Sequence, residues 1–241
     1  MDSMKNSKQT IQNHNAKTKS RFYDKRKIWM ESVPFIIFLV LIVVAIVYYP
    51  SIPSTIPTHW NARGQADGFG GRNSIFIIPI IFLVVLILLL ILPLMEVFRE
   101  NMIKIYNYYY AFKIMFSIFF AVLFLTTIYS TLGYAINVSR IVLGMVGVLF
   151  ISLGIILPKL KRNFMFGIRT GWTLSSDTVW DKTHKIGGVL FLIIGIMTII
   201  ELFILQLETI FYIFVTSIIL VSLFLVFYSY YLYKNSGSTK K

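Results

Sequence analysis

The chain has 241 residues, of which 57% are hydrophobic and 14% are charged, and its formal net charge is +13. This composition is far from that of a soluble domain, and the apolar residues occur in long runs rather than at amphipathic spacing. The sequence contains no cysteine, which excludes disulfides, thiolate nucleophiles, cysteine metal sites and a lipoprotein anchor. These properties predict an integral membrane protein.

Six apolar runs predict six membrane-spanning helices. Each run approaches the ~20 residues that an α-helix needs to cross ~30 Å of hydrocarbon. The runs lack the alternation that marks a membrane β-strand, and a helix satisfies its own backbone hydrogen bonds in lipid. The predicted fold class is therefore an all-α, six-helix transmembrane bundle. The expected spans are Val33 to Tyr49, Ile75 to Leu94, Ile114 to Leu132, Ile141 to Leu157, Ile186 to Leu205 and Ile210 to Tyr233.

The basic residues predict how the bundle is oriented. Alternating the loops across the membrane places all of the 23 Lys and Arg residues on one side except Arg63, Arg72 and Arg140. By the positive-inside rule this basic side is the cytoplasm, so both termini are expected there. Anionic lipid head groups attract basic residues next to span ends, so membrane lipid is the expected partner of this charge, and direct nucleic-acid binding is not expected.

The same assignment divides the chain into five segments with two functional loops, one facing outward (51–74) and one facing inward (158–185). The first part of the N-terminal tail is polar and is expected to be disordered. The segments are a basic cytoplasmic tail (1–32), a two-helix unit that contains the outward loop (33–95), the third span with its flanking loops (96–140), a three-helix unit that contains the inward loop (141–233) and a cytoplasmic tail (234–241).

The outward loop carries side chains suited to bind a ligand. Prolines that restrict the backbone and glycines that permit tight turns predict a compact cap. His59 and Asp67 could form an acid–base pair or ligate a metal, or they could make loop hydrogen bonds. One histidine and one carboxylate are too few for catalysis or metal binding, so we expect no catalytic residue, metal or cofactor. The candidate ligand-binding residues are His59, Trp60, Asn61, Gln65 and Asp67.

The inward loop predicts a surface for a cytoplasmic partner. Ser175 or Ser176 can cap a short helix, and Asp177 suits the positive end of its dipole. We expect this helix to be amphipathic, to lie along the inner interface and to lead into the fifth span. Alternatively, the tryptophans belong to an interfacial aromatic belt, and the histidine is a solvated neighbour. The candidate partner-binding residues are Arg169, Trp172, Trp180 and His184.

Glycines in two spans predict close helix packing. Small residues let helix backbones approach one another in lipid, and Gly188 and Gly195 are one heptad apart on the fifth span. We therefore expect that replacing Gly195 with a large residue disturbs assembly. The corresponding glycines of the fourth span are Gly144, Gly147 and Gly154.

Glu201 is the only acidic residue well inside an apolar run. A charge at the bilayer centre costs about 2.5 to 3.5 kcal/mol on the insertion scale, so an intramembrane carboxylate is a candidate for transport or proton relay. Glu201 also lies about one turn from the expected outer end of its span, where its side chain could reach water. Both interpretations stay open at this point.

Two motifs indicate a family. The first is Ile56-Pro57-Thr58-His59-Trp60-Asn61 followed by Gly64-Gln65-Ala66-Asp67-Gly68. The second comprises Asn163, Gly167-Ile168-Arg169-Thr170, Trp172-Thr173-Leu174-Ser175, Trp180 and Thr183-His184-Lys185-Ile186-Gly187-Gly188. The second motif resembles that of the SdpI-like family of bacterial membrane proteins, and the first resembles the domain of unknown function, DUF1648, that these proteins often carry. The resemblance implies an immunity-type membrane protein, with protection against a secreted toxic peptide and signalling to a cytoplasmic transcriptional repressor.

Three functions remain in competition. We favour a membrane immunity or signalling protein, not an enzyme, in which the outward loop recognises a membrane-active toxic peptide and the inward loop engages a regulator. The first alternative is a small transporter or exporter that uses Glu201. The second is a membrane enzyme that uses His59 and Asp67. The sequence lacks a nucleotide-binding Gly-x-x-x-x-Gly-Lys-Ser/Thr loop, which weakens ATP-driven transport by this chain alone, and it lacks a His-Glu-x-x-His motif, which weakens a zinc-protease function.

Overall fold

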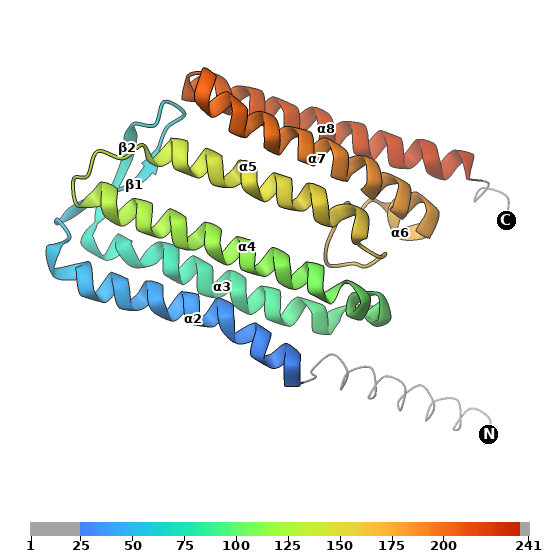
Figure 1. Cartoon of the computed structure of the whole chain (residues 1–241), viewed down its shortest axis with the longest axis horizontal. Coiled ribbons are helices and arrows are strands. Elements are labelled where there is room, and N and C mark those ends of the chain that lie inside the picture. The colour runs from blue at the N-terminus through green and yellow to red at the C-terminus, as the bar shows by residue number, and fades with distance from the viewer. Residues whose placement is uncertain (1–24, 237–241) are drawn as a thin grey trace.

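The computed structural model describes residues 25–236 as a bundle of six long helices (Figure 1). All six are long and apolar enough to cross a membrane, and together with the helical content of the chain they confirm the predicted all-α fold class. The disorder predicted at the start of the N-terminal tail lies outside the described residues. The long helices are α2 (Lys25–Tyr48), α3 (Ile77–Ile91), α4 (Arg99–Thr131), α5 (Val138–Ile156), α7 (Asp177–Ile204) and α8 (Leu207–Asn235).

Short 3-10 turns connect or extend several helices. Pro50, Pro93 and Pro158 each stand at the beginning of such a turn. Proline is tolerated there because its fixed φ suits a helical start and its missing N–H would have no helical partner. The turns are η1 (Tyr49–Ser51), η2 (Arg72–Phe76), η3 (Leu92–Met95) and η4 (Leu157–Lys159).

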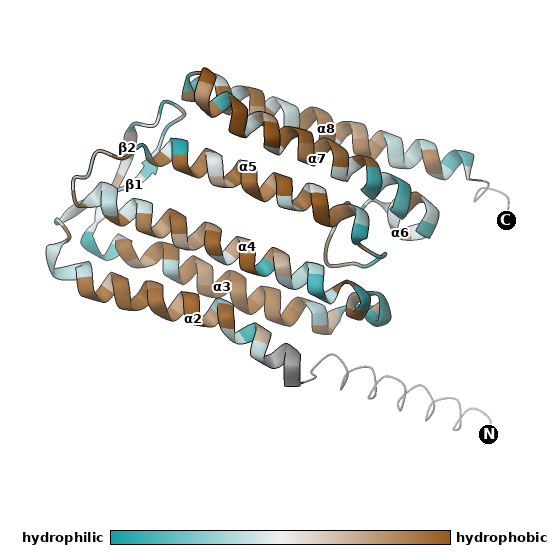
Figure 2. Ribbon diagram, viewed as in Figure 1, coloured by the Kyte–Doolittle hydropathy of each residue, from teal (hydrophilic) through white to brown (hydrophobic). Residues whose placement is uncertain are grey.

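The bundle has two distinct ends. One end, which we call the hairpin end, carries strands β1 (Thr55–Trp60) and β2 (Ala66–Gly71), the α4–α5 connection and the α7–α8 turn (Figure 1). The opposite end, the loop end, carries helix α6 (Gly171–Ser175) and the segment that precedes it. Hydrophobic residues dominate the middle of the helices, whereas polar residues gather at both ends (Figure 2). The outward and inward loops of the sequence analysis therefore lie at opposite ends of one bundle.

Helices α2, α3 and α4 share an apolar core that also holds the hairpin. Ile52 precedes the hairpin and Ile56 lies in β1, and each is only 1% exposed. Phe82 of α3 stacks on Phe120 of α4 with ring centroids 5.1 Å apart. Burying these side chains fixes the base of the hairpin against the helices. The buried members of this core are Leu41, Ala45, Ile52, Ile56, Ile75, Phe82, Leu86, Phe120, Phe124 and Ile128.

Helices α5 and α7 run antiparallel and approach each other through glycines, as the sequence predicted. A Cβ atom on Gly195 would lie 2.6 Å from the carbonyl oxygen of Gly147, and one on Gly154 would lie 2.8 Å from the carbonyl oxygen of Gly188. These distances are shorter than any real side chain tolerates. The two glycine pairs are one heptad apart on each helix, so a continuous stripe of backbone contact joins α5 to α7.

The structure corrects three details of the prediction. The cap at the hairpin end contains two strands, which the sequence analysis did not foresee. The helix capped by Ser176 does not end before the fifth span but continues through Gly187 and Gly188 as the first part of α7. Lys113 is not a loop residue at the edge of the third span: it is buried inside α4.

Candidate functional site

The hairpin end is built on a tight turn organised by Asn61. The strands pair antiparallel from Thr55 opposite Gly71 to Trp60 opposite Ala66, with irregular register around His59. The Asn61 side-chain oxygen accepts hydrogen bonds from the backbone N–H groups of Arg63 (3.0 Å) and Gln65 (3.1 Å). Gly64 has a φ of +81°, which favours glycine over any side chain. Asn61 therefore acts mainly as a structural turn residue.

His59 and Asp67 face each other across the hairpin. The distance from His59 Nδ1 to Asp67 Oδ1 is 2.5 Å, and the two side chains are 70% and 44% exposed. The carboxylate orients the imidazole so that its other nitrogen, Nε2, faces away from the pair. Trp60, the next residue of β1, is half-buried, and Gln65 is exposed. The hairpin therefore carries exposed polar side chains and one half-buried aromatic ring.

A metal centre requires more ligands than this pair provides. Across residues 25–236, no three His, Cys, Asp or Glu side chains gather in a way that could hold a metal ion. The contact that the structure shows for His59 and Asp67 is the hydrogen bond between them.

The hairpin turn is attached to the C-terminal helices. Arg63 Nε lies 3.0 Å from Glu208 Oε2 at the start of α8. A Cβ on Gly64 would lie 3.1 Å from both Asn137 Oδ1 and Leu207 Cδ1, so the turn sits closely over the starts of α5 and α8. Two helices that are distant in sequence from the hairpin therefore help to hold its tip.

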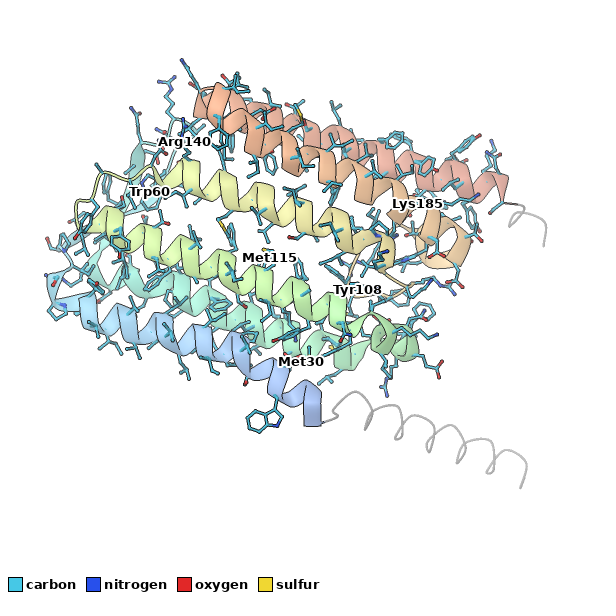
Figure 3. All side chains as sticks on the ribbon, viewed as in Figure 1. Met30, Trp60, Tyr108, Met115, Arg140 and Lys185 are labelled. Carbon is cyan, nitrogen blue, oxygen red and sulfur yellow. The ribbon has the colours of Figure 1, made fainter. Side chains whose placement is uncertain are left out.

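An open pocket of about 520 Å³ lies where these segments meet. Its lining comes from the hairpin turn, from the first residues of α5 and from the α7–α8 turn. Arg140 and Trp60 mark this end of the molecule in Figure 3. The lining residues are Arg63, Arg140, Gln206, Leu207 and Glu208.

At the loop end, Asn163 and Glu96 fold the inward loop against the helices. Asn163 is fully buried, and its side-chain oxygen accepts hydrogen bonds from the N–H groups of Met165 (2.9 Å) and Phe166 (2.6 Å). Glu96 is 1% exposed, and its carboxylate accepts bonds from the N–H groups of Phe98 and Phe164, both at 2.9 Å. The loop is therefore a folded structure in which the buried Asn163 and Glu96 side chains are hydrogen-bonded.

Trp180 and His184 form the buried support of this loop. Their rings stack with centroids 4.0 Å apart, and the two residues are 0% and 1% exposed. His184 Nδ1 lies 2.9 Å from the Trp180 carbonyl oxygen, which can only accept, and Nε2 accepts from the N–H of Ile168 at 2.9 Å. These partners require a neutral imidazole protonated on Nδ1. Both nitrogens are occupied, so His184 is structural in this arrangement.

Gly167 explains why the loop can lie so close to His184. Its φ is +125°, and an added Cβ would collide with His184 Nε2 and lie 3.3 Å from Trp180. Trp180 and His184, four residues apart, share one face of α7, and this face is interior. The loop folds over these two side chains in this structure, and their role in partner binding stays a prediction.

Arg169 and Trp172 remain accessible at the loop end. Arg169 is exposed and donates a hydrogen bond to the Phe164 carbonyl oxygen. Trp172 is half-buried against Tyr230 of α8, with ring centroids 5.1 Å apart. Thr170 caps α6 and lies 3.0 Å, hydroxyl to hydroxyl, from Ser229 of α8. Helix α8 therefore contacts the inward loop near its C-terminal end and the hairpin near its N-terminal end.

Sequence analysis missed a buried ion pair between α2 and α4. Glu31 accepts hydrogen bonds from the ammonium of Lys113 and from the hydroxyl of Tyr106. The Lys113 and Glu31 side chains are 3% and 20% exposed, and the Lys113 ammonium lies 5.2 Å from the Tyr109 ring centroid. Each charge adjoins an apolar run in the sequence, which made both look like span-end residues. Their similar depth on two neighbouring helices was the available signal.

Glu201 is 8% exposed on α7, within its last turn before the hairpin end. The burial is greater than expected for a side chain that simply reaches water. Arg140 donates to the carbonyl oxygen of the adjacent Leu202 at 2.7 Å. Glu201 therefore lies near the hairpin-end pocket in the fold, although it does not line that pocket.

Comparison with known proteins supplies the family context. The model of the SdpI/YfhL protein family matches residues 159–229, and that of the domain of unknown function DUF1648 matches residues 36–83. The chain carries an SdpI-family region. This SdpI-family region spans the inward loop, α7 and most of α8, whereas the DUF1648 match spans the second half of α2, the hairpin and the start of α3. The resemblance predicted from the two motifs is confirmed.

Two curated proteins extend the comparison. Immunity protein SdpI from Bacillus subtilis (strain 168) is 26% identical over 212 residues, which cover 86% of this chain and 98% of that protein. An uncharacterized protein from Archaeoglobus fulgidus is 42% identical over 36 residues, or 15% of this chain and 20% of that protein. No solved structure matches the chain. The SdpI-family region and the six apolar helices identify a multi-pass membrane protein.

Proposed function

We propose that this chain is a bacterial plasma-membrane immunity protein that recognises a membrane-active toxic peptide at its hairpin end and engages a cytoplasmic regulator at its loop end. Similarity to an immunity protein over 86% of the chain supports the general role. The observation that carries the two-surface proposal is that α8 contacts both functional loops, through Glu208 and Arg63 at one end and through Ser229 and Thr170 at the other.

The hairpin end has the chemistry needed to bind an amphipathic peptide. His59, Gln65 and Asp67 offer exposed polar groups, and Trp60 is half-buried beside them. Phe69 is 62% exposed on the second strand and adds an apolar contact. A toxic peptide that inserts into membranes must carry both apolar and polar surface. Binding at this end would hold the peptide at the head-group level before it enters the bilayer.

The loop end offers a smaller partner surface than the sequence suggested. Arg169 and Trp172 are the accessible members of the original set, and Trp180 and His184 hold the loop that presents them. Ligand binding can alter this surface only if the two states of the protein bind the ligand with different affinity. Helix α8, which contacts both loops, is the element through which such a difference would act.

Protection of living cells tests the recognition site. A sensitive bacterial host that expresses the protein is challenged with a panel of membrane-active peptides. Trp60→Ala and Asp67→Ala are each expected to reduce protection at least about tenfold in inhibitory concentration, equivalent to about 1.4 kcal/mol of binding. The reason is that one change removes the aromatic contact and the other removes the carboxylate that orients His59.

Two variants serve as matched controls for this experiment. Trp29→Ala removes a tryptophan that is 78% exposed far from the hairpin, and Asp181→Ala removes an exposed carboxylate at the loop end. Both should protect as well as the unchanged protein. Protein amounts in the membrane fraction are compared by immunoblot. Full protection by both hairpin variants at equal abundance would reject the outer recognition site.

A transporter is the second candidate, and the burial of Glu201 favours it. Intramembrane carboxylates commonly mark ion or proton pathways. If Glu201→Gln alone abolishes protection and efflux of a labelled peptide stops with it, transport replaces recognition as the mechanism.

The orientation of the bundle is tested by thiol labelling in intact cells. Because the chain has no cysteine, Ala66→Cys and Ser175→Cys each introduce a single thiol at an exposed position, one at each end. A membrane-impermeant maleimide is expected to label Ala66→Cys at once and Ser175→Cys only after lysis. The positive-inside rule is the basis of this expectation. The reverse pattern would place the hairpin in the cytoplasm and contradict the proposed route of recognition.

A further inference from the structure

The hairpin-end pocket concentrates positive charge on the side of the membrane where the chain has little. Of the 23 Lys and Arg residues, only Arg63, Arg72 and Arg140 are assigned to this side. Two of these three, Arg63 and Arg140, line the same pocket although they are far apart in the sequence. The fold therefore brings together most of the outward basic residues at one place.

Helix starts add to this positive potential. Helix α5 begins at Val138 and α8 at Leu207, and both starts adjoin the pocket. The N-terminus of a helix carries a partial positive charge and unpaired N–H groups. At the start of α5, the Asn137 side-chain oxygen accepts a hydrogen bond from the Arg140 N–H at 3.0 Å, whereas Gln206, the residue before α8, makes no side-chain capping bond. Two guanidinium groups and the start of α8, which has no side-chain cap, therefore lie at the same pocket as one carboxylate, that of Glu208.

Glu208 shows which ligand chemistry the pocket accepts. Its carboxylate meets Arg63 through Nε at 3.0 Å, while Arg140 donates from Nη1 to the Leu202 carbonyl oxygen at 2.7 Å. A guanidinium has five N–H donors in a planar fork that matches a carboxylate. These bonds use one nitrogen of each arginine. The Arg63 and Glu208 side chains are 68% and 38% exposed, and exposed ion pairs contribute little stability, so a second carboxylate can replace Glu208.

We propose that the pocket between the hairpin turn, α5 and α8 binds a carboxylate of the peptide ligand, at its C-terminus or on an acidic side chain, in exchange for Glu208. This proposal rests on the proposed recognition of a peptide and names the group recognised. Leu207, which is 7% exposed, supplies an apolar floor beside the charges. The exchange frees the start of α8, the same helix that holds Thr170 and Trp172 at the loop end.

Binding of a small peptide acid tests the pocket independently of protection. The full chain is placed in phosphatidylcholine nanodiscs, and the probe is dansyl-Phe-Leu with a free C-terminal carboxylate, compared with its C-terminal amide. Fluorescence anisotropy, corrected with empty nanodiscs, gives Kd for each. We expect the acid to bind at least about tenfold more tightly than the amide, because charge-assisted bonds to arginine require the carboxylate.

Four variants distinguish the pocket from a general structural defect. Their expected effects on binding of the acid differ in direction, whereas a structural defect would weaken binding in every case. Arg63→Gln and Arg140→Gln should each remove most of the preference for the acid. Glu208→Gln should tighten binding of the acid several-fold, because it removes the competing carboxylate while keeping the shape of the side chain. Lys104→Gln, which removes an exposed charge on α4 near the loop end, should change nothing. Thermal unfolding midpoints establish that each variant is folded.

Several results would overturn the proposal. Equal Kd values for acid and amide would do so, and so would a Glu208→Gln variant that binds the acid no better than the unchanged protein. If Arg140→Gln does not fold, Arg63→Gln still decides, because Arg63 pairs only at an exposed position. A lipid site is tested with phosphatidylglycerol nanodiscs and native mass spectrometry. Retention of phosphatidylglycerol that depends on Arg63 and Arg140, without any preference for the peptide acid, would assign the pocket to a lipid phosphate instead.

Failure of the binding experiment can be distinguished from failure of the cell-protection experiment. Loss of the acid preference with protection intact rejects the pocket but leaves peptide recognition in place. A clear acid preference in a protein that protects against no peptide in the panel supports the pocket and rejects the immunity role.

Discussion

Gly195→Ala is expected to lower the free energy of unfolding by about 1–3 kcal/mol, the usual cost of overpacking a tight contact. The added methyl group would lie 2.6 Å from the backbone nitrogen of Ile151 as well as from the Gly147 carbonyl oxygen. Backbone atoms cannot rotate away as a side chain can, so α5 and α7 must separate along the glycine stripe. Gly195→Leu should have a larger effect and reduce the amount of folded protein in the membrane.

Gly144→Ala is the matched control for this prediction. Gly144 lies on the same helix interface, but a Cβ there meets only the Leu202 side chain, at 3.4 Å, an ordinary contact. Because alanine has the higher helix propensity by up to about 1 kcal/mol, this variant should be neutral or slightly more stable. Unfolding in mixed micelles, followed by circular dichroism during titration with a denaturing detergent, measures both. Equal stability of the two variants would contradict the glycine-stripe interpretation.

Lys113→Met is expected to destabilise the protein by about 3–5 kcal/mol, the range for removing one partner of a buried ion pair. The carboxylate of Glu31 would remain between α2 and α4 without its main charged partner, although the Tyr106 hydroxyl would still donate to it. The effect arises from the uncompensated charge and not from lost volume, because methionine fills a similar space. The same detergent titration measures the change.

The double variant separates charge from packing. Glu31→Gln combined with Lys113→Met removes both charges and should recover much of the stability lost by Lys113→Met alone, which gives a large coupling energy in a double-mutant cycle. Lys104→Met, at an exposed position of α4, should shift stability by less than about 0.5 kcal/mol. If Lys113→Met is no more harmful than Lys104→Met, the pair has no structural importance.

The six helices and the glycine contacts could be predicted because their signals are local. A run of about 20 apolar residues has few alternatives in lipid, and small residues one heptad apart must share a helix face. These features depend on sequence periodicity, which a single chain displays directly. The pairing of Gly147 with Gly195, by contrast, came only from the structure.

The hairpin was missed because its strands have weak intrinsic signals. The second strand reads Ala-Asp-Gly-Phe-Gly-Gly, and glycine and aspartate are poor strand formers. The first strand contains Pro57, which is tolerated in a two-stranded sheet because every strand there is an edge. Pairing comes instead from Ile52 and Ile56, which are held in the helix core. Such support is tertiary and has no local pattern.

The sequence assigned the candidate ligand and partner residues to two loops, but how each side chain is held in its loop required coordinates. Sequence spacing placed Trp180 and His184 on one face but could not show that Gly167 lets the loop fold back over that face. Likewise, Arg63 and Arg140 were counted only for orientation, because nothing local brings residues from the hairpin and α5 to one pocket. In both cases the decisive contacts join residues that are distant in the sequence.

The ion pair between Arg63 and Glu208 joins two regions that family models treat as separate modules. Arg63 lies within the match to DUF1648, and Glu208 lies within the match to the SdpI/YfhL family. A substitution at Arg63 therefore changes which side chain is needed at position 208 to keep the ion pair, and a substitution at Glu208 does the same for position 63. Chimaeras that exchange hairpins among homologues should accordingly inherit the donor's peptide preference only when position 208 is exchanged as well.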